Sequence, residues 1–154
     1  MSSFLSFWFR RKEWFLPEEQ ERIEAAVQRA EKETSGEIRI YIESKCSYVN
    51  AVDRAVELFE QLSMTQTAER NGVLIYLAMK DHQLAVIGDL GIHEKVGSAF
   101  WQDEVGKMIR EFRARHVVEG IIGIVEDIGQ ALRHHFPYTG TDKNELPDQL
   151  LFGR

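Results

Sequence analysis

The chain has 154 residues, of which 44% are hydrophobic and 10% aromatic, and its formal net charge is −6. This length fits one domain with one core, the apolar fraction argues against a disordered protein, and the single cysteine, Cys46, excludes an internal disulfide. The acidic balance argues against nucleic acid as a partner, because binding to phosphates needs a basic face.

Residues 1–16 form an aromatic segment around a basic cluster, Arg10-Arg11-Lys12. Large aromatic residues beside cations suit a peripheral membrane contact, but packing of these aromatics on the domain or on a second copy is the favoured alternative. No apolar run reaches the roughly 20 residues that cross a bilayer, and the basic residues follow the apolar run, unlike in a signal peptide. We therefore expect a cytoplasmic protein with no transmembrane segment.

The next part of the chain predicts a helix, a strand and a second helix. Pro17-Glu18-Glu19 predicts a helix start, and Ser35-Gly36 predicts the end of that helix. Residues 37–43 alternate between isoleucine and polar side chains, which is typical of a half-buried strand. After a polar loop, residues 52–62 carry a broad apolar stripe that predicts a helix.

Residues 72–78 are apolar on both faces and predict a buried central strand. A turn at residues 80–82 then reverses the chain into a second apolar strand that starts at Leu84. Strand 37–43, the helix and strand 72–78 make a βαβ unit, whose two strands are parallel. Apolar stripes over residues 101–112 and 117–132 predict two further helices, and Gly120 and Gly123 in the second indicate a close approach to a neighbour.

Oxygen-bearing side chains gather where these predicted strands begin. Glu37 starts the first strand, Asn71 precedes the second, and the hairpin returns Asp89 to the same edge. Glu94 follows on a short turn or helix, and Asp103 lies in the first turn of the next helix. Hard cations such as Ca²⁺ and Mg²⁺ bind carboxylates and amide carbonyls, so these five residues predict a divalent-cation site. Solvated loop carboxylates and helix caps are the alternative, and the spacing alone favours them.

Arg70, beside this cluster, could contact a phosphate or an acidic group, although a salt bridge to Glu69 or Asp89 is the more common arrangement. No histidine has a partner at zinc spacing, and no nucleophile motif or phosphate-binding loop is present. The chain therefore shows no complete catalytic set, and its status as an enzyme stays open.

Three motifs in order resemble the TPM-domain family, named after a thylakoid-lumen protein, a photosystem II repair protein and a nematode receptor modulator. They are residues 34–39, 70–75 and 88–92, and residues 144–148 resemble a small, stand-alone bacterial branch of the family. The resemblance covers about residues 17–153. It implies a three-layer α/β/α sandwich with a mixed, partly parallel sheet, a β-hairpin, and helices on both faces.

The resemblance also implies divalent-cation binding, chiefly of Ca²⁺, in loops at one edge of the sheet. The matching positions are Asn71-Gly72, Gly88 to Gly91, Glu94 and Asp103, while Asp89 stands where other members often have an aromatic residue. We expect three parts: the N-terminal segment of residues 1–16, the α/β domain of residues 17–136, and a tail of residues 137–154 whose apolar end docks on the domain.

Three functions follow from these expectations. The favoured one is a module that binds a divalent cation, Ca²⁺ or else Mg²⁺, and acts through an unknown protein partner. The second is a metal-assisted acid phosphatase, the activity attributed to the plant branch, with Arg70 on the phosphate. The third is a membrane-adjacent assembly factor that uses residues 1–16.

Overall fold

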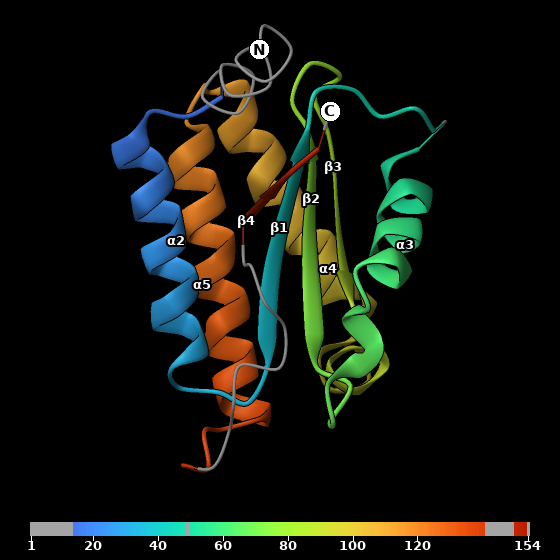
Figure 1. Ribbon diagram of the computed structural model, residues 1–154, viewed down its shortest axis with the longest axis vertical. Helices are drawn as coiled ribbons and strands as arrows, with labels where there is room; N and C mark the ends of the chain where they lie inside the picture. Colours follow the sequence, from blue (N-terminus) through green and yellow to red (C-terminus); the bar gives the residue numbers. More distant parts are fainter. Residues whose placement is uncertain (1–13, 49, 141–149, 154) are drawn as a thin grey trace, which may run out of the picture.

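Figure 1 shows the computed structural model, which describes residues 14–48, 50–140 and 150–153. The elements in chain order are α2 (Pro17–Glu31), β1 (Glu37–Glu43), α3 (Ala51–Gln61), the short 3-10 helix η1 (Met64–Gln66), β2 (Gly72–Ala78), β3 (Gln83–Gly88), α4 (Leu90–Arg113), α5 (Val117–His135) and β4 (Leu150–Phe152).

The four strands form one sheet in the order β3-β2-β1-β4, with helices on both faces (Figure 1). Helices α2, α4 and α5 share a core with the isoleucines of β1, and α3 packs with Leu74, Tyr76 and Ala78 on the other face of β2. The predicted three-layer α/β/α sandwich is thus confirmed. None of the helices among the described residues combines the length and apolarity needed to cross a membrane.

The register of the sheet brings the predicted hairpin and βαβ unit together. β1 runs parallel to β2 with Glu37 opposite Gly72, and β3 runs antiparallel to β2 with Val73 opposite Gly88. β2 is buried at every position, as predicted for a central strand. β4 lies parallel to β1 on its other side, so the apolar end of the tail adds a strand to the sheet.

β1 differs from the half-buried strand that its alternation predicted. Its isoleucines lie in the core as expected, but the polar side chains of Arg39 and Glu43 are only 5% and 6% exposed. Arg39 Nη1 donates to Leu62 O at 2.8 Å, beyond the end of α3. The alternation therefore reflects one apolar and one polar face, both of which are covered.

Two glycines act differently from the sequence-based expectation. α2 ends at Glu31, and Gly36 does not cap it, since its backbone is not left-handed. Instead a Cβ on Gly36 would lie 2.7 Å from Leu132 Cδ2, so this glycine lets the start of β1 approach α5. Gly97, with φ +79°, kinks α4. Asp103 lies in the part of α4 after this kink, whereas the sequence predicted it in the first turn of a separate helix.

Two sequence segments that carried expectations are described only in part. In the N-terminal segment, residues 1–13 lie outside the described residues, whereas Phe15 is buried and Trp14 packs against the same core. This agrees with the alternative that the aromatics pack on the domain, at least for these two residues. The motif at residues 144–148 also lies outside the described residues.

Candidate functional site

The starts of β1 and β2 and the end of β3 meet at one edge of the sheet. Asp89 N–H donates to Gly72 O at 2.9 Å, and Glu37 N–H donates to Asn71 O at 3.4 Å. The structure thus brings together four of the predicted site residues, which we call the edge cluster: Glu37, Arg70, Asn71 and Asp89.

Both side-chain oxygens of Asp89 accept hydrogen bonds. Its Oδ2 accepts from Arg70 Nε at 2.6 Å, and its Oδ1 accepts from Arg70 Nη2 and from Leu90 N, both at 2.8 Å. The side chain of Asp89 is 5% exposed, whereas that of Arg70 is 46% exposed. Asp89 therefore caps α4 and holds Arg70 in a two-pronged ion pair, which confirms the predicted salt bridge and raises the pKa of the Arg70 guanidinium.

The main chain of Arg70 completes the cap of α4. Its carbonyl oxygen accepts from Gly91 N at 2.8 Å and from Ile92 N at 3.3 Å, and its backbone is left-handed with φ +53°. A Cβ on Gly91 would lie 2.2 Å from Glu69 O, so this close approach requires glycine. The first N–H groups of α4 are consequently satisfied inside the protein and are not directed at an external anion.

Asn71 carries one of three buried side-chain oxygens that have no hydrogen-bond partner among the described residues; the other two are Gln83 Oε1 and Glu104 Oε1. Asn71 is 1% exposed, its N–H donates to Thr67 Oγ1 at 3.0 Å, and its Nδ2 donates to Ser35 Oγ at 3.1 Å. Its Oδ1 is buried and accepts no hydrogen bond from any described residue. Because an unpaired buried acceptor is costly, this oxygen marks a place for a water molecule or a cation.

The other two predicted ligands, Glu94 and Asp103, make no hydrogen bond or ion pair with the edge cluster in the part of the chain that the structure describes. Glu94 is exposed on the first turns of α4, and Asp103 is exposed and lines a cavity of about 510 Å³ beside Glu104, Lys107 and Asp127. Within residues 14–48, 50–140 and 150–153, no group of three or more His, Cys, Asp or Glu side chains is arranged to hold a metal ion.

Sequence reasoning missed the buried carboxyl group of Glu104, which lies in that cavity between α4 and α5. Glu104 is 3% exposed, and Lys107 Nζ donates to its Oε2 at 3.2 Å and to Asp127 Oδ2 at 3.0 Å. Burial, together with the nearby carboxylate of Asp127, raises the pKa of Glu104 to about 7. The signal was present in the sequence, since Glu104 shares the helical spacing of the core residues Trp101 and Met108.

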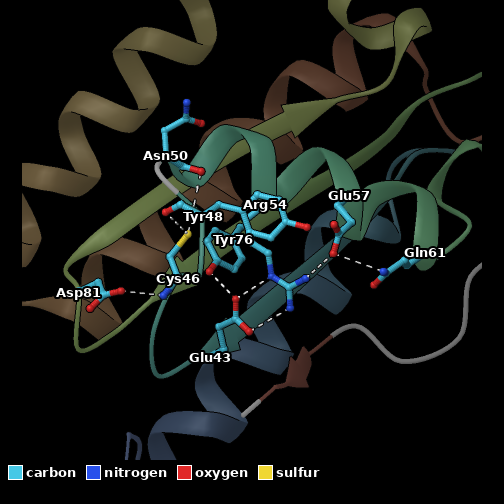
Figure 2. A network of polar contacts seen from close by, with 9 residues as sticks. All are labelled: Glu43, Cys46, Tyr48, Asn50, Arg54, Glu57, Gln61, Tyr76 and Asp81. Atoms are coloured by element: carbon cyan, nitrogen blue, oxygen red, sulfur yellow. Dashed lines mark hydrogen bonds and ion pairs between the residues drawn. The ribbon is translucent and has the colours of Figure 1, made fainter.

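Figure 2 shows a third polar network, at the opposite edge of the sheet where β1 ends. The Glu43 carboxylate accepts from Arg54 Nε at 2.9 Å, from Arg54 Nη2 at 3.1 Å, and from the Tyr76 hydroxyl. Cys46 N–H donates to Asp81 Oδ2 at 2.7 Å and joins the loop after β1 to the hairpin turn. Both oxygens of Glu43 are engaged, so this network ties α3 to the sheet rather than offering a free carboxylate.

Comparison with known proteins identifies the family. The sequence model of the protein family described as the TPM domain matches residues 10–131 of this chain. The chain belongs to the TPM-domain family. Among solved structures, the NMR structure of the BA42 protein from the psychrophilic bacterium Bizionia argentinensis has a TM-score of 0.83 and 36% sequence identity, over 91% of this chain and 96% of that chain. None of the curated proteins matches the sequence. Two of the motifs that pointed to the TPM family, residues 70–75 and 88–92, supply most of the edge cluster.

Proposed function

We propose that this TPM domain binds a divalent cation, Ca²⁺ or else Mg²⁺, at the edge cluster and acts through a protein partner. The observation that carries the proposal is the buried Asn71 Oδ1, which has no hydrogen-bond partner among the described residues. Calcium takes six to eight oxygen ligands, which include amide and backbone carbonyls and water, so a site does not need three carboxylates.

Asp89 is the carboxylate that fits this role best. It is buried, and among the described residues its ion-pair partner is Arg70, whose side chain is half exposed. A cation would compete with the guanidinium for the Asp89 oxygens, while Leu90 N–H keeps the carboxylate oriented. Glu37 begins the neighbouring strand, and Glu94 on the first turns of α4 is an outer candidate.

An exposed apolar side chain adjoins the edge cluster and supports the partner part of the proposal. Leu90, next to Asp89, is 55% exposed at the start of α4. A cation that released Arg70 from Asp89 would change the charge directly beside this leucine, so a partner that contacts Leu90 would sense the cation. The phosphatase alternative ranks lower, because Arg70, its candidate phosphate contact, is held by Asp89.

The test is a Ca²⁺ titration of chelator-treated protein followed by amide NMR, with Mg²⁺ in parallel. We expect saturable shifts at Asn71 and residues 88–91. Asp89→Asn keeps an N-cap residue and removes the charge, so it should weaken binding about tenfold or more, which corresponds to about 1.4 kcal/mol.

Two matched variants define the outcome that contradicts the proposal. Glu60→Gln removes an exposed carboxylate on α3 and should leave the affinity unchanged. Asp103→Asn removes the carboxylate that lines the cavity between α4 and α5. The edge cluster is the wrong place if Asp103→Asn weakens binding and Asp89→Asn does not, and the cation proposal itself fails if no shift saturates at millimolar Ca²⁺.

A further inference from the structure

A cavity of about 680 Å³ opens between the hairpin turn and the junction of α4 with α5. These segments lie at the same end of the molecule, away from the starts of β1 and β2 (Figure 1). The volume of this cavity is in the range of small-molecule sites. The lining divides into an apolar wall and a basic rim: Met79, Ile109, Phe112 and Val117 form the wall, and His82, Arg113 and Arg115 form the rim.

The rim carries positive charge that the described part of the protein does not balance. None of the described residues that line the cavity is acidic, and Arg113 and Arg115 are exposed and make no ion pair with any described residue. This differs from Arg54 and Arg70, whose guanidinium groups are held by Glu43 and Asp89. Two unpaired guanidinium groups beside one cavity are suited to a carboxylate, which arginine binds through paired hydrogen bonds.

Arg115 also occupies a backbone position that normally favours glycine. It follows the last residues of α4 with φ +63°, and its N–H donates to Phe112 O at 3.1 Å. Glycine is the usual residue at this left-handed position after a helix, because a side chain there is strained. The Arg115 side chain makes no hydrogen bond or ion pair with a described residue that would offset this strain.

The wall supplies the complementary apolar surface. Ile109 is 36% exposed, and Phe112 and Val117 are half-buried and packed against the core. The geometry points to a ligand that has both a negative charge and an apolar part: this cavity binds a carboxylic acid whose carboxylate is free and whose alkyl chain is of medium length. The chain lies on Ile109 and Phe112, and the carboxylate meets Arg113 and Arg115. A neutral apolar ligand would leave the rim charges unused.

The aromatic N-terminal segment is a competing occupant of the apolar wall. Its own cations, Arg10, Arg11 and Lys12, carry the same sign as Arg113 and Arg115. Charge complementarity therefore favours the carboxylate over this segment. The surface of an anionic membrane is the other competitor, and a concave cavity of this size favours a single free chain over a lipid surface.

The test uses the full chain and decanoate, followed by amide NMR and by calorimetry. We expect saturable shifts at His82, Ile109 and Phe112. Decanol, which has the chain without the charge, and acetate, which has the charge without the chain, should each bind at least tenfold more weakly. The double variant Arg113→Gln/Arg115→Gln should lose at least tenfold in decanoate affinity, while Arg133→Gln, an exposed arginine at the far end of α5, should lose none.

Arg115→Gly separates ligand binding from folding. It relieves the left-handed strain, so its melting temperature should equal or exceed that of the wild type while its decanoate affinity falls. Equal binding of decanol and decanoate, or unchanged affinity in the double variant, overturns the proposal. So do binding to phosphatidylglycerol vesicles without binding to decanoate, and nuclear Overhauser contacts between residues 4–9 and Ile109 in the free protein. None of these outcomes depends on cation binding at the edge cluster.

Discussion

Single residues in this protein serve the fold and the candidate sites at once. Asp89 caps α4 and pairs with Arg70, and both interactions use the oxygens that a cation would need. The sequence predicted that Asp89 lies beside the start of β2, because the hairpin reverses the chain and returns this residue to that edge. A salt bridge between Arg70 and Asp89 was one of the arrangements expected from the sequence, but the engagement of both Asp89 oxygens, one of them also by Leu90 N–H, was not.

Glu104 makes stability depend on pH. The pKa of Glu104 is raised from its ordinary value of 4.5 to about 7, chiefly by burial. The folded protein therefore binds this proton more tightly than the unfolded chain, and its contribution to stability is lost as the pH rises from about 4.5 to about 7. Glu104→Gln stays neutral at every pH, so we expect a higher melting temperature than the wild type at pH 8 and little difference at pH 4.

Calorimetric melting between pH 4 and pH 8 checks this expectation. Glu126→Gln, an exposed glutamate on α5, is the matched control and should follow the wild-type curve. A pH profile of Glu104→Gln that is parallel to the wild type would mean that Lys107 keeps Glu104 ionised in the folded protein.

The packing of α4 against α5 depends on one of two glycines that look alike in the sequence. A Cβ on Gly120 would lie 2.8 Å from Glu111 Cβ and 3.0 Å from Met108 Sδ, whereas a Cβ on Gly123 would meet nothing within 4 Å. The predicted close approach is thus present at Gly120 and absent at Gly123.

Alanine substitutions should therefore have opposite effects at these two positions. Gly123→Ala should stabilise the protein by up to about 1 kcal/mol, because alanine is the better helix former. Gly120→Ala should destabilise it by roughly 1–3 kcal/mol, because the helices must move apart. Urea unfolding of both variants measures the difference. A stabilised Gly120→Ala would show that α4 and α5 pack less closely than their backbones indicate.

At the scale of the whole molecule, the α3 layer is attached to the sheet through a buried ion pair. Arg54 and Glu43 have side chains that are 16% and 8% exposed, and Glu43 also accepts from the Tyr76 hydroxyl. Arg54→Ala leaves the Glu43 carboxylate buried without its cation, so we expect a loss of about 3 kcal/mol or more.

Arg22→Ala is the control for this pair. Arg22 lies 3.6 Å from Glu119 on the surface, and exposed pairs of this kind contribute under about 1 kcal/mol. Denaturant unfolding of the two variants gives the comparison. Equal losses would mean that Glu43 takes up a proton or reaches water when Arg54 is removed.

The sequence by itself determined the elements near to one another along the chain. Apolar periodicity depends on neighbouring residues, so it located the helices, the hairpin and the parallel β1–β2 pair, and with them the positions of Glu37, Asn71 and Asp89. The motifs at residues 70–75 and 88–92 also carried the TPM family assignment, which the family match bears out.

Only the tertiary structure decided which distant residues meet and which polar faces are buried. Leu150–Phe152 pairs with β1, Arg39 bonds to Leu62 and Glu43 to Arg54, and Lys107 contacts both Glu104 and Asp127. Each of these contacts joins segments that no local pattern relates. Asp103, on the part of α4 that follows Gly97, likewise lines the cavity beside Glu104, Lys107 and Asp127. Burial and close approach are properties of the packed whole, because each depends on side chains contributed by several elements at once.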